Sequence, residues 1–540
     1  MRRVLFLVAM TVPLPAQMTE ISGDRIRAHV KFLSSDLLEG RGVGSRGGDL
    51  ASEYMATQFA LIGAKPLGDA GTYFQQISLV GVEPLPAAQL TMIPTRSNRN
   101  PVTFQWLDQF VGVTQQQRPD AAFDAPAVFV GHGIVAPEYQ WDDYRGADVR
   151  GRVVVMFTNE PPSSDPNFFK GRALTYYGRW TYKFEEAARH GAAAAIIIHT
   201  TPTASYGWDV VRSSWGREDQ QVRVALGARE LAFAGWVTQE AGERIAEAAG
   251  RTVEQMLKAA DTRGFRATEL PLRLRGSAPA KIRDIHTRNV VAKIDGSDPQ
   301  LKSEAVVFNA HWDHLGVGEP VDGDSIYHGA VDNATGCGML LEIARAWAAL
   351  PEKPRRSAIF LAATSEEAGL LGSKYFGEHP PIPASKLALA INYDGFQPWG
   401  RTSDVVVNGA ERTTAYPIVR EAAQRFNLTI APDPRPEAGL YYRSDHFSFA
   451  RVDIPAFSIE EGRDLLGKPA GTGERLYTDY NDHRYHQPSD KYSEDWDFSG
   501  MVEYCRFGML IAVDVANSPN LPTWHAGDEF LPMRRKESAK

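Results

Sequence analysis

Near-continuous apolar runs alternate with amphipathic segments through the second half of the chain. Runs of this kind are typical of strands that are buried on both faces of a sheet. Residues 337–350 and 415–426, which lie between such runs, carry apolar positions at helical spacing. The alternation predicts an α/β fold with a mostly parallel central sheet flanked by helices. The apolar runs occupy residues 289–294, 305–310, 358–364, 387–394 and 454–459.

The first half of the chain has a different texture. Residues 22–34 and 48–62 carry helix-spaced apolar positions, and a last helix is expected from about 500 to 516. Short apolar runs separated by Gly and Pro, with one helix at 180–191, indicate an inserted, smaller, β-rich domain. The predicted segments are 1–17 (leader), 18–107 (first part of the main domain), 108–280 (insert), 281–520 (rest of the main domain) and 521–540 (tail).

The amino terminus, MRRVLFLVAMTVPLPAQ, has the pattern of a signal peptide. Two arginines precede a short apolar run, and the small residue Ala16 follows it. This run is shorter than the ~20 apolar residues that a bilayer span requires, and no other stretch approaches that length. We therefore expect a secreted or periplasmic protein without a stable membrane span.

Composition narrows the choice of partners. The chain has 540 residues, 43% of them hydrophobic and 23% charged, which is the balance of a soluble globular protein. A formal charge of -8 indicates no concentrated basic face, so a nucleic-acid partner is not expected. Cys337 and Cys505 are too few for a disulfide framework. Both lie in helical patterns, which favours two buried free thiols and leaves a bridge between them as the alternative.

Side chains that bind metals follow the apolar runs. In open α/β sheets, ligands gather beyond the carboxyl ends of the strands, which is where these side chains are expected. A glycine-bounded loop, GAVDNATG, and a later loop, YHQPSD, add further candidates. The candidates are His311, Asp313, Asp332, Glu366, Glu367, Asp394 and His486.

A metal centre explains this convergence. Carboxylates gathered at one sheet edge would repel each other strongly without a cation between them. Zinc accepts imidazole nitrogen and carboxylate oxygen and leaves a position for water at catalytic sites. Two histidines and three acidic residues suffice for two ions if one carboxylate bridges them. The adjacent Glu366 and Glu367 then predict a division of labour, in which one coordinates and the other transfers a proton.

The motifs HWD, GAVDNATG, SEEAGLLGS, NYDG and YHQPSD resemble those of the double-zinc aminopeptidases, whose relatives include glutamate carboxypeptidase and the transferrin receptor. The resemblance covers about residues 285–515 and implies a zinc peptidase catalytic domain over 281–520. The insert, with DVRGRVVVMF and KFEEAARHGAAAAIIIH, is similar to the protease-associated domain that many members carry. That similarity implies a lid that shapes substrate access.

The resemblance implies two zinc ions per chain. Asp332 would bridge the two ions. Glu367 and His486 would complete one site, and His311 with Asp394 would complete the other.

The resemblance also implies the catalytic roles. Glu366 would be the general base, and Asp313 would orient His311. Tyr485 would hydrogen-bond the tetrahedral intermediate, with a packed loop tyrosine as the alternative. Residues 444–449, SDHFSF, would line the substrate pocket or have a structural role.

His314 and His483 are neighbours of candidate residues, but the family pattern places no ligand at either position. We therefore expect both to be pocket or surface residues.

The predicted function is that of a secreted zinc exopeptidase, an aminopeptidase acting on peptides. A glutamate carboxypeptidase-like dipeptidase is an alternative, because the insert holds Arg172, Arg179 and Arg212, which could bind a substrate carboxylate. A glutaminyl cyclase-like acyltransferase would use a single zinc, and a receptor-like binding protein would have lost ligands. The full ligand set favours the two-zinc peptidase.

Overall fold

The computed structural model describes residues 20–95, 100–204, 206–225 and 230–531. The predicted signal peptide, residues 1–17, lies outside the described residues. The described chain forms two compact units. The main unit contains residues 20–77, Thr287–Asp433 and 444–531, and the insert unit contains Ser78–His286 with Pro434–Arg443.

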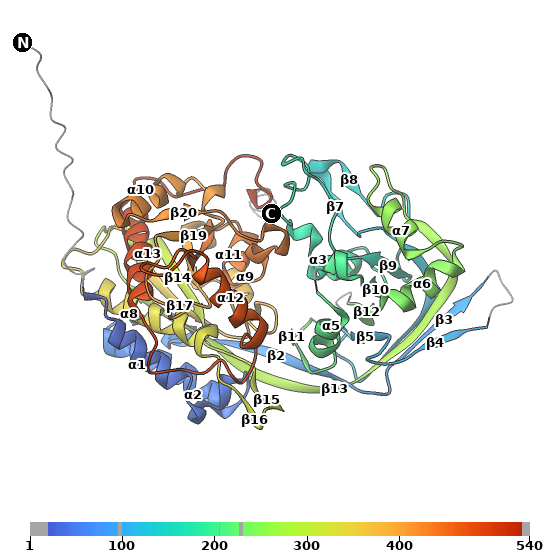
Figure 1. The fold of residues 1–540 in the computed structure, drawn as a ribbon, viewed down its shortest axis with the longest axis horizontal. Coiled ribbons are helices and arrows are strands. Elements are labelled where there is room, and N and C mark those ends of the chain that lie inside the picture. Colours follow the sequence, from blue (N-terminus) through green and yellow to red (C-terminus); the bar gives the residue numbers. More distant parts are fainter. Residues whose placement is uncertain (1–19, 96–99, 205, 226–229, 532–540) are drawn as a thin grey trace, which may run out of the picture. The chain divides into compact units, whose positions relative to one another are not determined.

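The main unit is built on a mixed sheet whose central strands run parallel (Figure 1). The four central strands run parallel to one another, whereas β13 and β19 each run antiparallel to the central strand beside them. The prediction of a mostly parallel central sheet is confirmed. In spatial order the strands are β1 (Lys65–Pro66), β13 (Thr268–Ile294), β17 (Ser357–Ala363), β14 (Ala305–His311), β18 (Leu387–Tyr393), β21 (Ala456–Glu461), β19 (Asp404–Asn408) and β20 (Thr429–Ala431).

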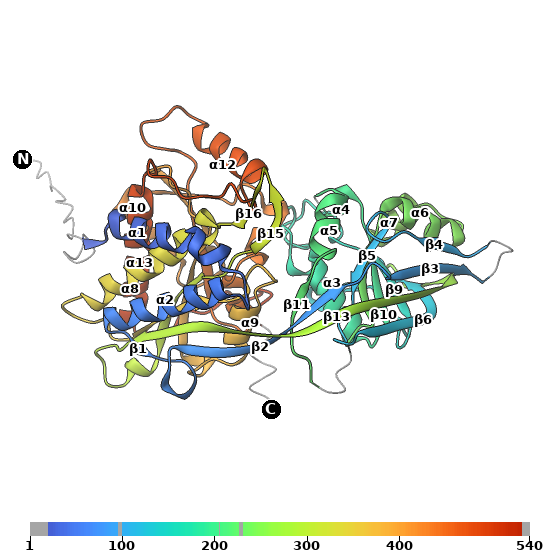
Figure 2. The same cartoon turned by 90° about the horizontal axis from the view of Figure 1, so that it is seen from below.

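Helices cover both faces of this sheet. Alternation along β14 divides its side chains, so that Val306 and Phe308 belong to one core and Val307 to the other. Figures 1 and 2 show α1, α2 and α8 together on one face. That face is covered by α1 (Gly23–Leu33), α2 (Arg46–Ile62), α8 (Gly336–Ala348), α10 (Tyr416–Phe426) and α13 (Ser499–Asn517), and the other by α9 (Leu371–Glu378) and α11 (His446–Arg451).

Capping residues explain where α2 begins and ends. The Ser45 side chain accepts a hydrogen bond from the amide of Gly48, as a helix N-cap does. Gly63 adopts φ 81° immediately after the helix, a conformation that glycine tolerates without steric cost. The two amino-terminal helices predicted from the pattern are thus present. No helix within the described ranges is long and apolar enough to cross a membrane.

The insert unit has its own sheet and core. Its parallel strands β6 (Asp120–Phe129), β9 (Val153–Phe157), β10 (Ala194–Ile198) and β12 (Phe233–Val237) are extended by β5 (Phe110–Val113), which runs antiparallel to β12. The helices of this unit are α3 (Trp180–Arg189), α4 (Thr201–Ala204), α5 (Trp208–Trp215), α6 (Gln239–Ala248) and α7 (Val253–Ala260).

The boundary of the insert lies earlier than residue 108, where the sequence texture placed it. The unit begins at Ser78, inside β2 (Phe74–Pro84). The reason is strand pairing, because β3 (Gln89–Pro94) pairs antiparallel with residues 272–277 of β13. That pairing draws a segment assigned to the main domain into the sheet of the insert.

The predicted tail, residues 521–540, also begins too early. Trp524 and Phe530 are buried in the main unit, 2% and 1% exposed. The guanidinium of Arg412 lies over both rings and donates hydrogen bonds to the carboxylate of Asp528. These side chains have no helical or strand periodicity, so the sequence pattern did not reveal their packing. Residues 521–531 therefore belong to the folded unit.

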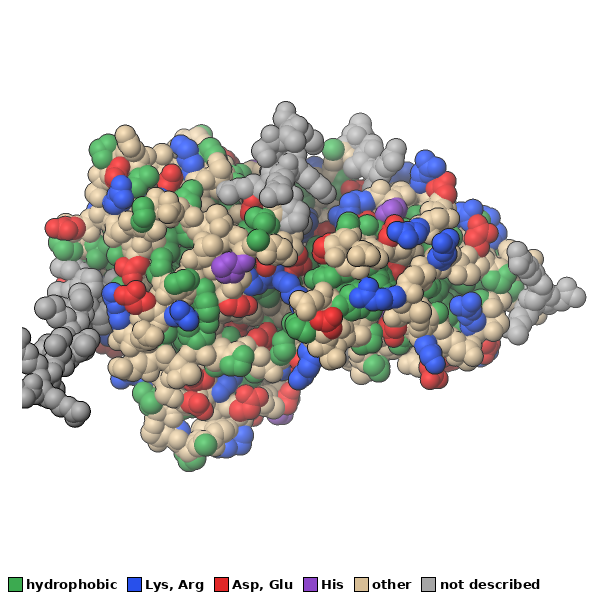
Figure 3. Space-filling model, turned by 90° about the horizontal axis from the view of Figure 1, so that it is seen from above, with side chains coloured by type: hydrophobic (Ala, Val, Ile, Leu, Met, Phe, Trp, Pro, Cys, Tyr) green, Lys and Arg blue, Asp and Glu red, His purple; other side chains and the backbone are tan. Residues whose placement is uncertain are grey.

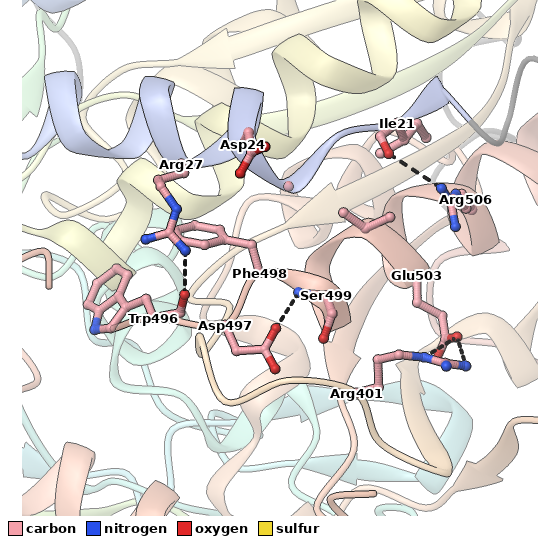
Figure 4. Close-up of a pocket in the computed structure, with 12 residues that line it drawn as sticks. Ile21, Asp24, Arg27, Arg401, Trp496, Asp497, Phe498, Ser499, Glu503 and Arg506 are labelled. Atoms are coloured by element: carbon pink, nitrogen blue, oxygen red, sulfur yellow. Dashed lines mark hydrogen bonds and ion pairs between the residues drawn. The ribbon is translucent and has the colours of Figure 1, made fainter. Parts of the chain in front are cut away.

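A polar surface pocket of about 680 Å³ opens between the starts of α1 and α13 (Figure 4). Arg27 donates to the backbone oxygen of Trp496 at 2.6 Å, and Arg401 donates to Glu503 at 2.8 Å. None of the candidate metal ligands lines this pocket. Its arginines fasten α1 and the neighbouring loop to α13.

We expect Phe308→Ala to lower the free energy of unfolding of the main unit by about 3–5 kcal/mol, because it leaves a cavity in the core. The Phe308 ring is fully buried and lies 5.7 Å from Trp347 and 5.4 Å from Phe360, measured between ring centroids. Urea denaturation measures the change. Leu61→Ala is the control, since Leu61 is 76% exposed and its loss should change stability by less than ~0.5 kcal/mol. Equal effects of the two variants would contradict this packing.

Candidate metal centre

Three parallel strands end at the same edge of the main sheet and deliver most of the candidate ligands. His311 is the last residue of β14, and Asp394 follows the last residue of β18. Asn309 pairs with Asn392, so the register places His311 directly beside Asp394. Glu366 and Glu367 follow the end of β17, the other neighbour of β14. The predicted convergence at the strand ends is therefore present.

Asp332 lies between two histidines that are far apart in the sequence. Its loop, Ala330–Thr335, directly precedes α8. One carboxylate oxygen, Oδ1, lies 3.2 Å from Nε2 of His311, and the other, Oδ2, lies 3.2 Å from Nε2 of His486. The two oxygens therefore face two different imidazoles, as a bridging carboxylate would.

Each imidazole also meets a second carboxylate. His311 Nε2 lies 3.1 Å from Oδ1 of Asp394, and His486 Nε2 lies 3.0 Å from Oε2 of Glu367. A ring N–H shared between two oxygens makes two bent, weaker hydrogen bonds, so hydrogen bonding alone satisfies neither group fully. The separations do match the edges of a tetrahedron around zinc, which are ~3.3 Å for bonds of ~2.0 Å. These five side chains have the chemistry and spacing to hold two ions.

The charges of the site depend on one another. Burial disfavours the imidazolium form of His486, but Glu367 and Asp332 outweigh burial and raise its pKa to about 10. At His311, burial is likewise outweighed by Asp394 and Glu366, and the pKa lies well above its usual value. The carboxylates thus hold protons on both rings at the positions where a metal would bind, which is the behaviour of a site built for cations.

The adjacent glutamates have opposite environments. Burial, reinforced by Asp394 and Glu367, raises the pKa of Glu366 well above its usual value, although His311 opposes the shift. Burial also acts on Glu367, but His486 and His314 outweigh it and lower the pKa of Glu367 to about 2. Two carboxyl groups whose pKa values are pushed apart are suited to different tasks. Glu366 is thus the one that can carry a proton, and Glu367 is the one that stays ionised.

Asp313, which the resemblance implied would orient His311, lies next to that ring. Nδ1 of His311 is 3.2 Å from the backbone oxygen of Asp313 and 3.8 Å from its carboxylate oxygen Oδ1. That same Oδ1 accepts a hydrogen bond from the amide of Glu366 at 3.2 Å. The backbone oxygen is therefore the closer partner of the ring, and the carboxylate connects the ring to the loop that carries both glutamates.

Sequence reasoning missed Arg41, a buried arginine at the centre of the loops. It lies in the turn between α1 and α2 and is 1% exposed. Its guanidinium joins the end of α1 to the two loops that carry His311 and Asp332. It donates hydrogen bonds to the backbone oxygens of Leu33, Trp312, His328 and Gly329 at 2.6–2.9 Å.

Asp490 ends the motif YHQPSD, and sequence reasoning assigned it no role. Its carboxylate accepts hydrogen bonds from the amides of Val331, at 3.0 Å, and Asp332, at 3.1 Å. It also accepts a hydrogen bond from the hydroxyl of Tyr480. Asp490 thereby fixes the backbone from which the Asp332 carboxylate projects. The only sequence signal was an acidic residue four positions after His486.

The remaining candidates have clear places. His314 is buried, its Nδ1 lies 2.5 Å from Oε1 of Glu367, and its ring centroid lies 5.7 Å from that of His486. His314, Asp332 and Glu367 also form a group that could hold a metal ion. Ser444 donates a hydrogen bond to Oδ2 of Asp394 at 2.5 Å. The Tyr485 ring stacks on the ring of His486, with 3.9 Å between centroids, and is partly exposed.

Two further polar residues stay outside the ligand set. Asp445 is buried and accepts a hydrogen bond from Asn309, which is a structural contact rather than part of a catalytic triad. His483 is exposed on α12 (Thr472–His483).

Cys337 and Cys505 are both buried free thiols. Among the described residues, the groups that could hold a metal ion all lie in the main unit.

Comparison with known proteins gives a consistent result. Residues 289–505 match the family model described as peptidase family M28. A vacuolar membrane protease from Verticillium alfalfae is 30% identical over 128 residues, which are 24% of this chain and 11% of that protein. A probable zinc metalloprotease from Pyrenophora teres f. teres is 33% identical over 111 residues, which are 20% of this chain and 23% of that protein. The match thus spans less than a quarter of either relative.

A solved structure extends the likeness to the whole fold. An aminopeptidase from Aneurinibacillus sp. strain AM-1 has a TM-score of 0.51 and 18% sequence identity, covering 95% of this chain and 98% of that chain. At this identity the likeness concerns the fold. The matched family segment contains every one of the five side chains gathered at the strand ends. Residues 289–505 therefore form a domain of peptidase family M28.

Proposed function

We propose that the protein is a two-zinc exopeptidase, and specifically an aminopeptidase. The observation that carries this proposal is the placement of Asp332, whose two oxygens each lie 3.2 Å from a different histidine. His311 and Asp394 would hold one ion, and His486 and Glu367 the other. Bound zinc would polarise the substrate carbonyl and lower the pKa of a shared water.

Glu366 is the proposed general base. Its Oε2 lies 4.0 Å from Nε2 of His311, at the edge of the ligand set. Because burial raises its proton affinity, Glu366 in its ionised form would accept the proton of the attacking water and return it to the departing amine. Tyr485, which is stacked on His486, is proposed to hydrogen-bond the tetrahedral intermediate.

Family membership and fold support hydrolysis of peptides, and the alternatives predict different behaviour. A glutamate carboxypeptidase-like enzyme would prefer N-acylated glutamate dipeptides, whereas an aminopeptidase would prefer aminoacyl-nitroanilides. A glutaminyl cyclase-like enzyme would bind one zinc and cyclise amino-terminal glutamine. The five gathered ligands favour two ions, because each imidazole meets its own pair of carboxylates.

We further propose secretion or a periplasmic location, supported by the signal-peptide pattern at the amino terminus. The insert unit is proposed to be a protease-associated domain, supported by its own sheet and core and by its sequence texture. On the face drawn in Figure 3, basic and acidic side chains are interspersed, which suits a small peptide as partner better than a polyanion.

The purified protein is expected to bind about two zinc ions per chain, measured by inductively coupled plasma mass spectrometry. Asp332→Asn should lose most of both ions, because its carboxylate faces both ligand pairs, whereas His311→Ala should retain about one. His483→Ala is the control and should keep both ions, since its side chain is 70% exposed. One ion per chain in the unmodified protein would contradict the dinuclear site.

We expect Glu366→Gln to bind zinc normally and to lower kcat on leucine p-nitroanilide by about 10²–10⁴-fold, because proton transfer is lost while the ligands remain. Stopped-time assays with metal-loaded protein measure this change. Glu421→Gln removes the same charge from the exposed surface of α10 and should leave kcat unchanged. Near-normal turnover by Glu366→Gln would remove this residue from the mechanism.

A further inference from the structure

Glu460 lies near the end of the strand next to the one that Asp394 follows, although it is not one of the candidate ligands. It is the next-to-last residue of β21, which runs parallel to β18. Tyr393 pairs with Ile459, so the next step of the register places Glu460 alongside Asp394. In-register residues of neighbouring parallel strands project from the same face of a sheet. Glu460 therefore projects from the face that carries His311 and Asp394.

The contacts of Glu460 confirm this orientation. Asn408 on β19 donates to Oε1 of Glu460 over 3.5 Å, and Asn408 itself pairs in register with Ser458. Ser458 in turn pairs in register with Asn392 of β18. Ser458 and Glu460 therefore project from the same face of β21, and Glu460 lies nearer to the end of the strand.

Glu460 forms no ion pair within the described chain, although the charge of Arg463 lowers its pKa. The nearby Arg463 forms its ion pair with Glu461, whose carboxylate lies 3.3 Å away, and no described residue forms an ion pair with Glu460. Burial is the main cause that raises the pKa of Glu460 to about 7, and Asp433 and Glu461 add to it. A partly buried carboxylate with one long hydrogen bond is poorly stabilised unless a cation reaches it.

Glu460 is also more accessible than its neighbours. The residues of β21 from Ala456 to Ile459 are buried, and so is Glu461, but Glu460 is partly exposed. A group from outside can therefore reach this carboxylate. A purely structural glutamate would be expected to have a strong partner in the fold, and the single 3.5 Å contact is a weak one.

We propose that Glu460 is a specificity-determining residue that receives a protonated nitrogen of the substrate. This inference rests on the proposed function, because the metal edge beside Glu460 is where the scissile bond would lie. The substrate class is then peptides that present a cation at the cleaved end. A substrate whose cleaved end carries a carboxylate would be repelled, which separates this enzyme from an acidic-dipeptide carboxypeptidase.

Two nitrogen atoms have the required chemistry. One is the free α-amine of the terminal residue, and the other is the side-chain nitrogen of a terminal lysine or arginine. Both donate charge-assisted hydrogen bonds to a carboxylate. The experiment is therefore built to distinguish them.

Four amides form a factorial set: leucinamide, N-acetyl-leucinamide, N-acetyl-lysinamide and lysinamide. Their dissociation constants are measured by isothermal titration calorimetry with metal-loaded Glu366→Gln protein, so that binding is read without turnover. The measurement is repeated with Glu460→Gln and with the control Glu421→Gln added to that background. A lost charge-assisted hydrogen bond should weaken binding about 10- to 100-fold.

If the α-amine is the partner, Glu460→Gln should abolish the preference for leucinamide over N-acetyl-leucinamide. If the nitrogen of the substrate side chain is the partner, Glu460→Gln should abolish the preference for N-acetyl-lysinamide over N-acetyl-leucinamide. Either result supports the proposal. Unchanged preferences in Glu460→Gln, or equal weakening for all four amides, would overturn it. Glu421→Gln should alter neither preference.

The binding test of Glu460 and the test of peptidase activity can fail independently of each other. If the unmodified enzyme hydrolyses no aminoacyl-nitroanilide but Glu460→Gln still loses its preference for cations, the peptidase assignment fails and the cation site stands. If the enzyme hydrolyses aminoacyl-nitroanilides but Glu460→Gln keeps the preference for cations, the peptidase assignment stands and the cation site fails. Glu460→Asp, which keeps the charge on a shorter side chain, should retain part of the preference and guards against misfolding of the glutamine variant.

Discussion

One carboxylate, that of Asp332, imposes the arrangement on which the rest of the main unit depends. It is buried, and each of its oxygens faces the imidazole of a different histidine. A desolvated carboxylate next to Glu367 and Asp394 is stable only if positive charge lies between them. The strand ends must therefore deliver the other ligands to within about 3 Å of Asp332, and small errors in register would separate them.

Two further side chains hold the loops in that geometry. Arg41 binds backbone oxygens on both sides of the site, and Asp490 binds the amides of Val331 and Asp332. Each connects segments that are more than 150 positions apart. The turn after α1 and the loop before α13 therefore both hold the loop that carries Asp332. Because these bonds are buried, each loses little strength to competition with water.

The sequence predicted the sheet and brought out the candidate ligands because both follow from local patterns. Strands buried on two faces must be apolar along their length, so His311 and Asp394 stand out where those strands end. The unit boundary was not predictable in the same way, because β13 is a single strand of 27 residues whose pairing partners change along its length. The role of Arg41 could not be predicted from any sequence pattern, because its partners are backbone oxygens, which any residue supplies.

Charge counting explains why Glu460 differs from the carboxylates beside it. In the proposed loaded site, two zinc ions carry four positive charges. Asp332, Glu366, Glu367 and Asp394 would together carry four negative charges, and passing a proton to Glu366 from a water in the site would leave that balance unchanged. The positive charge of the two ions would therefore be balanced by the carboxylates of the site, with no excess to neutralise a further carboxylate. Glu460, on the strand next to the one that Asp394 follows, is outside that balance and adds a further negative charge when it is ionised. Arg463 is paired with Glu461, so the proposed counterion of Glu460 is the substrate itself.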